Sequence, residues 1–224
     1  MMRQASGVAA FVLHQRDWQD SGRIFELMTR DHGRLSVFAQ GVRGPRARLA
    51  AVMQPFVPLL VSWAGRGEAP RLTGAEVAPH ALGAAPLPAD RLMCAYYLSE
   101  LLLSLTARHD VLPELHDHYG AALQGLRSTG SMDRELRLFE KRLLDVLGYG
   151  IPARREGVEA DPLGLDRISP EALQCLVDED LDDPAVVEEL RPLLRRTLAL
   201  CLDGRSLRTR EVARSLVEFR RVNP

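Results

Sequence analysis

Residues 34–63 read RLSVFAQGVRGPRARLAAVMQPFVPLLVSW, and this stretch decides how the first part of the chain is organised. Two apolar runs of β-type residues, 35–39 and 54–63, flank a loop at 41–48 that contains no acid. Three arginines lie in this loop: Arg43, Arg46 and Arg48. Because a loop held on a rigid sheet cannot bury three guanidinium groups, the pattern favours contacts with phosphate over catalysis.

Further β-type runs lie on both sides of this stretch. Residues 7–14 and 23–29 precede it and residues 71–76 follow it, each rich in apolar or β-branched side chains. Gly33 ends a turn that joins two of these runs and is placed for a positive φ. Five short strands with glycine turns and no helix predict a small closed barrel such as an OB-fold.

The composition changes after residue 80. A boundary is marked by prolines and a glycine set among alanines: Pro79, Gly83, Pro86 and Pro88. Leucine then replaces valine, and apolar residues recur at helical spacing. The spacing predicts helices at 92–105, 113–126 and 136–147, and capping residues predict further helices from Ser169 and Asp183.

The expected fold class is therefore α+β with two domains. Residues 1–80 form a five-stranded OB-fold barrel, and residues 81–224 form an all-α helical domain in which 150–183 is irregular. Pro192 is expected to kink or divide the long helix that follows.

Charge is distributed unevenly along the chain. The formal net charge is −1, but residues 1–80 hold ten arginines against six acids and therefore carry +4, whereas residues 81–224 carry −5. The two parts are thus suited to different partners. Lys141 is the only lysine, which fits phosphate binding by guanidinium groups but equally fits a genomic composition bias.

The cysteines are odd in number and scattered, with no C-x-x-C: Cys94, Cys175 and Cys201. This usage is typical of a reducing compartment and argues against a disulfide framework or structural zinc site. With no transmembrane stretch and no secretion signal in the sequence, we expect a cytoplasmic protein without membrane contact.

The nucleic-acid signal is the strongest functional one. Six arginines on turns and strand edges of the predicted barrel are the candidate DNA-binding residues: Arg34, Arg43, Arg46, Arg48, Arg66 and Arg71. Phe38, Phe56 and Trp63 lie among them, and basic grooves with aromatic platforms are how OB-folds hold single strands. The alternative is that the aromatic residues are core, which alternation favours for Phe56 and Trp63.

No constellation predicts catalysis. His116 and His118 point to different faces of a helix, Glu100 and Glu140 have arginines within helical reach, and the acidic run at 178–183 is explained by a solvated loop before a helix. No catalytic residue, metal ligand or cofactor is therefore predicted.

Short sequence motifs along nearly the whole chain resemble those of the bacterial recombination mediator RecO family. They are AFVLH at 10–14, AQG at 39–41, QPF at 54–56, GRGE at 65–68, AYYLSELL at 95–102, LRLFE at 136–140, LGYG at 147–150 and GRSLRTRE at 204–211. The resemblance implies an OB-fold followed by a helical domain and a non-catalytic, nucleoid-associated role in recombination and repair of DNA damage. Many members carry a four-cysteine zinc site after the LGYG motif, but no cysteine occurs at 150–168 here.

The resemblance also implies the partners. Members of the family bind single- and double-stranded DNA, anneal complementary strands, act with RecR in the RecFOR pathway, and help load RecA onto DNA coated by the single-stranded-DNA-binding protein, whose acidic C-terminal tail they engage. For that tail we predict Arg137 as the guanidinium with Lys141 one turn on. Three leucines are the predicted lining of the groove, with plain core as the alternative: Leu101, Leu102 and Leu105.

Two other classes remain open at this stage. An OB-fold RNA-binding or translation-associated factor would share the barrel and the basic loop. A metal-dependent nuclease would need carboxylates that converge on a cation, and the sequence offers no persuasive set.

Overall fold

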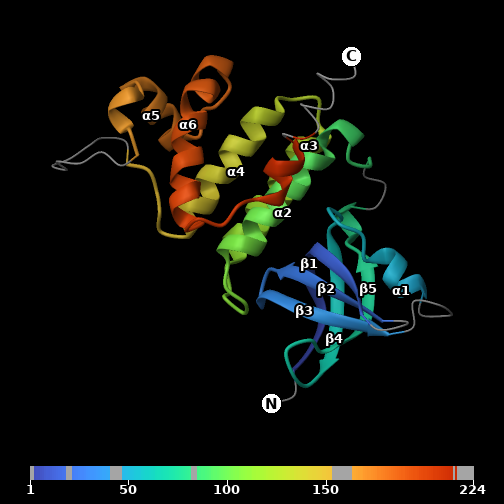
Figure 1. The fold of residues 1–224 in the computed structure, drawn as a ribbon. Coiled ribbons are helices and arrows are strands. Elements are labelled where there is room, and N and C mark those ends of the chain that lie inside the picture. Colours follow the sequence, from blue (N-terminus) through green and yellow to red (C-terminus); the bar gives the residue numbers. More distant parts are fainter. Residues whose placement is uncertain are drawn as a thin grey trace. The chain divides into compact units, whose positions relative to one another are not determined.

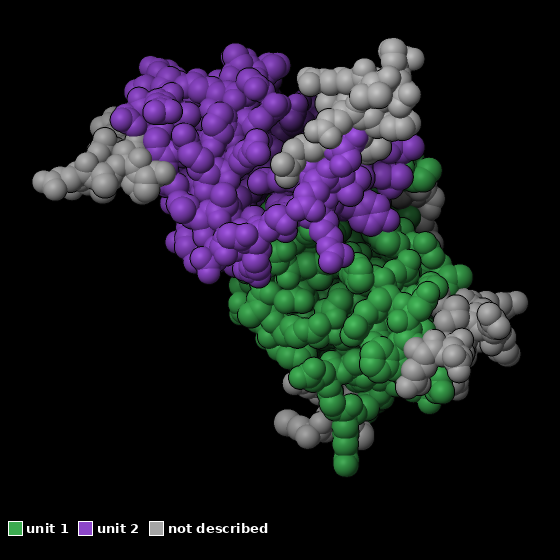
Figure 2. Space-filling model, in the orientation of Figure 1, with its two compact units in different colours: residues 1–87, 99–120 green, residues 88–98, 121–224 purple. Residues whose placement is uncertain are grey.

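In the computed structural model, the described residues are 3–18, 22–40, 47–81, 85–152, 163–213 and 215. They group into two compact units (Figure 2). Unit 1 comprises residues 1–87 and 99–120, and unit 2 comprises residues 88–98 and 121–224.

Five strands of unit 1 form a closed barrel in the order β1-β2-β3-β5-β4 (Figure 1). The strands are β1 (Arg3–Trp18), β2 (Gly22–Thr29), β3 (Gly33–Gln40), β4 (Leu59–Gly65) and β5 (Arg71–Val77). The long strand β1 makes closure possible, because Arg3 to Ala10 pair with β4 and Ala10 to Trp18 pair with β2. The predicted five-stranded OB-fold is confirmed.

Strand alternation fills the barrel. Leu59, Val61 and Trp63 of β4 point inward and are at most 3% exposed, which is the period-2 pattern expected of a half-buried strand. Leu35 and Val37 of β3 meet them in the same core cluster. Trp63 is therefore core, as alternation favoured.

A short helix corrects the expectation that the first 80 residues contain none. Helix α1 (Ala47–Val52) includes the last two residues of the segment 41–48 that was expected to be a loop, and strand β4 begins only at Leu59 rather than at residue 54. Leu49 and Val52 pack against the barrel core, so tertiary packing stabilises a segment too short to be helical alone. Phe56 is buried outside a strand with a φ of 67°.

The turn between β2 and β3 shows why Gly33 is required. Its φ is 65°, as predicted, and a Cβ there would lie 2.0 Å from the Asp110 carbonyl oxygen. Residues 99–120 pack on the barrel in unit 1: the Phe11 ring lies edge-on to Tyr119 at 5.1 Å, and the Tyr119 and Ser99 hydroxyl groups are 2.7 Å apart.

The helical part of the chain has five labelled α-helices and one further helical segment among its described residues. They are α2 (Leu92–Leu105), α3 (Pro113–Arg127), α4 (Met132–Val146), α5 (Pro170–Asp178) and α6 (Pro184–Cys201), and residues 208–213 are also helical. Short 3₁₀ turns occur at Pro79–Ala81, Ala89–Arg91 and Leu165–Arg167. Ser131, Ser169 and Asp183 cap α4, α5 and α6 with their side-chain oxygens.

Pro192 lies inside α6 without dividing it. The boundary between the units falls within α2, after Leu98, and within α3, after Gly120. The α+β class with a helical C-terminal part is confirmed.

Candidate functional site

The arginines predicted to bind DNA fall into three groups. Arg66, in the turn after β4, and Arg71, at the start of β5, are exposed. Arg43 and Arg46 lie outside the described residues, and Arg48 lies on α1. Arg34 differs from all of these because its side chain is only 13% exposed.

Arg34 is held by contacts within unit 1. Its Nε and Nη2 donate to the hydroxyl (3.2 Å) and carbonyl (2.8 Å) oxygens of Thr106, and Nη1 lies 3.6 Å from a Glu26 carboxylate oxygen. Burial lowers the pKa of Arg34 although Glu26 opposes the shift. Arg108 donates to the same Glu26 at 2.5 Å and to Ser36 at 2.6 Å. We therefore correct the assignment of Arg34: it is a structural residue that joins β3 to the end of α2.

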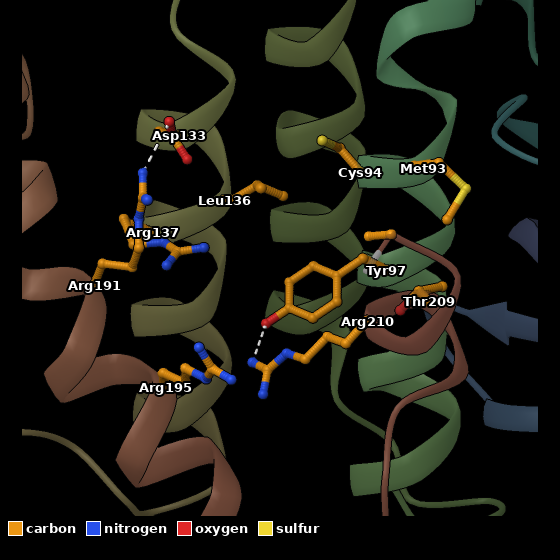
Figure 3. Close-up of a pocket in the computed structure, with 11 residues that line it drawn as sticks. Met93, Cys94, Tyr97, Asp133, Leu136, Arg137, Arg191, Arg195, Thr209 and Arg210 are labelled. Carbon is orange, nitrogen blue, oxygen red and sulfur yellow. Dashed lines mark hydrogen bonds and ion pairs between the residues drawn. The ribbon is translucent and has the colours of Figure 1, made fainter. Parts of the chain in front are cut away.

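A pocket of about 470 Å³ lies within unit 2 (Figure 3). Each contributing segment presents residues one turn apart, which places them on one helix face. They are Met93, Cys94 and Tyr97 of α2; Asp133, Leu136 and Arg137 of α4; Arg191 and Arg195 of α6; and Thr209, Arg210 and Ala213 of the last helical segment.

Positive charge dominates this pocket. Four arginines and one aspartate line it, and even with the buried Glu140 counted, the formal charge is +2. Arg191 is balanced by Asp133 at 3.1 Å and Glu188 at 2.9 Å. Arg195 makes no ion pair with another described residue. Figure 3 shows Arg137, Arg195 and Arg210 extending into the space between α2, α4 and α6.

A buried carboxylate organises one wall of the pocket. Glu140 is 1% exposed, and its Oε1 accepts from the Tyr97 hydroxyl at 2.5 Å and from Arg137 Nη2 at 3.0 Å. Arg210 donates to the same tyrosine oxygen at 2.9 Å, and its guanidinium carbon lies 5.4 Å from the centroid of the Tyr97 ring. This chain of contacts fixes the positions of two pocket arginines.

The protonation equilibria in this wall reflect burial. Burial raises the pKa of Glu140, and the Arg137 charge opposes the shift. Burial and the neighbouring Glu140 carboxylate also raise the pKa of Tyr97, so the phenol stays protonated and can donate. The pKa of the Cys94 thiol is likewise raised by burial, so it is a poor nucleophile.

Of the five residues predicted to hold a partner, only Arg137 lines the pocket. Lys141 pairs with Asp145 at 2.9 Å and Glu179 at 3.1 Å. Leu101 and Leu102 are fully buried in unit 1 and Leu105 is half-buried there. The prediction that Leu101 and Leu102 line a groove is therefore wrong. Both are core residues, which was the alternative interpretation.

Other sequence constellations are structural. His116 is buried against the Phe11 ring, and Asp117 pairs with Arg30 at 3.0 Å. In the acidic run, Glu179 pairs with Arg142, whose guanidinium lowers the pKa of Glu179 to about 2, and Asp182 pairs with Arg134 at 2.7 Å. Over the described ranges, no group of three or more His, Cys, Asp or Glu side chains could hold a metal ion.

Two family models match the chain. Residues 2–79 match "Recombination protein O N terminal" and residues 89–217 match "Recombination protein O C terminal". The chain belongs to the RecO family. The barrel lies in the first RecO match and the arginine-lined pocket in the second.

Curated relatives agree over nearly the full length. The protein named DNA repair protein RecO of Methylococcus capsulatus is 38% identical over 225 residues, which cover 92% of each chain. Those of Nitrosococcus oceani (95% of this chain, 93% of the relative) and Aromatoleum aromaticum (94% and 95%) are each 36% identical. No helix in the described part of this RecO-family chain is long and apolar enough to cross a bilayer.

Proposed function

We propose that this protein is a non-catalytic recombination mediator in DNA repair. It binds and anneals single-stranded DNA, also binds duplex DNA, and with RecR helps load RecA onto DNA coated by the single-stranded-DNA-binding protein. The observation that carries the proposal is the closed barrel in OB order within the RecO match, in a segment of net charge +4.

The barrel supplies the affinity for DNA. Exposed arginines such as Arg66 and Arg71 contact phosphates and release condensed counterions, which makes binding steeply salt-dependent and largely independent of base sequence. Annealing follows from the same charge, because two strands held on one basic surface repel each other less. No step needs a nucleotide or a metal.

The pocket of unit 2 supplies the partner contact in this proposal. An acidic C-terminal tail offers carboxylates and apolar side chains together. Arg137, Arg195 and Arg210 suit the carboxylates, whereas Met93 and Leu136 suit the apolar part. Docking of the tail there brings the barrel to coated DNA, where its arginines compete for exposed phosphates.

Fluorescence anisotropy of labelled single-stranded DNA over a salt series tests the proposal. Wild type should bind with a steep slope, and Arg43→Glu/Arg46→Glu/Arg48→Glu should reduce the slope by about two units, at roughly 0.7 per phosphate contact. Arg167→Glu, a single exposed charge reversal in unit 2, is the control. Preference for RNA in competition would favour the OB-fold RNA-binding factor instead.

A further inference from the structure

The outer face of the barrel carries aromatic rings and arginines at the end where β1 finishes and β2 begins. Strand pairing aligns Arg16 of β1, Ile24 of β2, Phe38 of β3 and Arg71 of β5 in one cross-strand row. The next row on the same face holds Trp18, Gly22 and Gln40. Arg16, Trp18, Phe38 and Arg71 lie on the outer face, because their neighbours Phe25, Val37, Ala39 and Leu72 belong to the core cluster. Ile24, between Arg16 and Phe38, is buried at 7% exposure.

Trp18 is unusual for a barrel residue. It is 44% exposed, although an indole is normally highly buried. The guanidinium carbon of Arg16 lies over the indole at 5.6 Å from the ring centroid, which holds the ring in place and puts a positive charge beside it. An exposed indole with an arginine against it has the features of a platform for a nucleic-acid base.

Phe38 forms the second part of this platform. It is half-buried, and its ring lies against the backbone of β2 at Gly22, where an added Cβ would be 2.5 Å from Phe38 Cε2. The same Cβ would be 2.7 Å from the Trp18 backbone carbonyl oxygen, because Gly22 pairs with Trp18 on β1 and with Gln40 on β3. Trp18 and Phe38 therefore flank β2 on the same face of the sheet. Phe38 was one of three aromatic residues singled out from the sequence, and it is the one that is not core.

The charges around the platform suit a strand of DNA. Arg16 and Arg71 lie at the two ends of the row. Three strand spacings, each about 4.8 Å, separate their strands. The acid on β1 is neutralised, since Asp17 accepts from Arg23 at 3.0 Å on the opposite face. Phosphates can therefore approach both arginines while one base stacks on Phe38 in this row and another stacks on Trp18 in the next row.

We propose that Trp18 and Phe38 form a base-stacking site for single-stranded DNA, with Arg16 and Arg71 holding the flanking phosphates. The inference rests on the proposed DNA binding and adds to it a preference for unpaired strands. A duplex keeps its bases stacked on one another and cannot offer them to the indole, so this site distinguishes single strands from duplex.

The chain offers a direct readout because it has two tryptophans. Trp63 is 3% exposed in the barrel core, so a change of fluorescence caused by stacking of a base comes from Trp18. The experiment titrates an oligothymidylate into wild type, Trp18→Phe and Trp18→Ala, and follows tryptophan emission together with the anisotropy of a labelled oligonucleotide. Tyr149→Ala, which removes an exposed aromatic side chain of unit 2, is the matched control.

Quenching of wild-type emission is expected, with the quench lost in Trp18→Phe while affinity changes little. Trp18→Ala should weaken single-stranded binding by roughly tenfold and leave duplex binding and the Tyr149→Ala control unchanged. Wild-type affinity in Trp18→Ala, or anisotropy without quenching, would overturn the stacking site and leave the proposed DNA binding intact. If the wild type showed no anisotropy change, both proposals would be wrong.

Discussion

The arginines of the barrel and those of the pocket have different surroundings. On the barrel, Arg66 and Arg71 stand exposed on a turn and at a strand start. In the pocket, Arg137 is 7% exposed and shares the buried Glu140 with Tyr97. Exposed, separately placed charges suit a polymer of interchangeable phosphates, whereas arginines fixed by a buried carboxylate suit one short acidic segment.

The largest expected difference between the pocket arginines and the barrel arginines is in how much each contributes to the free energy of unfolding. Arg137→Ala leaves Glu140 buried without its charged partner and should lower the free energy of unfolding by about 3–5 kcal/mol, measured by urea denaturation. Arg66→Ala removes an exposed side chain and should change it by less than about 0.5 kcal/mol.

Adding Glu140→Gln to Arg137→Ala should recover part of the loss, because the double variant no longer buries an unpaired charge. If Arg137→Ala unfolded at the same urea concentration as wild type, the contrast between a buried and an open set would be wrong.

Arg34 lies in unit 1 with the barrel arginines, but its side chain is buried. It therefore tests whether burial excludes an arginine of the barrel from DNA binding. Arg34→Ala leaves the Thr106 carbonyl without its donor and should cost about 1–3 kcal/mol in urea denaturation, with little change in the salt dependence of DNA binding. Arg71→Ala should do the reverse, with unchanged stability and a slope lower by about 0.7. A reduced slope in folded Arg34→Ala would return Arg34 to the DNA surface.

Arg195 lines the pocket and makes no ion pair with another described residue, so it provides a test of partner binding. Arg195→Glu should weaken binding of a peptide with the acidic tail by about tenfold, or about 1.4 kcal/mol, because an attractive charge becomes repulsive. Titration calorimetry measures the change, and Arg167→Glu, exposed in unit 2 but outside the pocket lining, should bind like wild type. Equal losses in both variants would indicate nonspecific attraction.

The ion pair of Glu179 with Arg142 is expected to make a small contribution to stability that depends on pH. Its pKa lies near 2, below the ordinary 4.5, so the unfolded chain binds the proton more readily. The stabilisation is present above pH 4.5 and is lost as the pH falls toward 2. Because both side chains are part-exposed, Glu179→Gln should cost less than about 1 kcal/mol at neutral pH, and the difference from wild type should shrink in acid. A constant difference across that range would assign the effect to packing.

Sequence patterns predicted the barrel well because alternation along a half-buried strand is local. Trp63 could be assigned from spacing alone to the inward face of β4, which it shares with Val61 and which is opposite to the face of Ser62. Helix α1 was missed because a six-residue helix depends on packing of Leu49 and Val52 on the barrel rather than on its own propensity.

The pocket could be predicted only in part. Arg137 was recognisable, but its companions Arg191, Arg195 and Arg210 come from segments far along the chain, and only the fold brings them together. The spacing of four residues between Arg191 and Arg195 in α6 was the available signal. Leu101 and Leu102 were misassigned because a helix that is apolar nearly all round does not reveal which face remains open.

A crossed binding experiment tests the division of labour between the two arginine sets most directly. Wild type, Arg66→Glu/Arg71→Glu and Arg191→Glu/Arg195→Glu are each titrated with labelled single-stranded DNA and with the labelled acidic tail peptide at one salt concentration. We predict that the first variant loses affinity for DNA and keeps the peptide, and that the second loses the peptide and keeps DNA. If either variant lost both ligands to the same extent while folded, the two surfaces would not be functionally distinct, which would contradict this account.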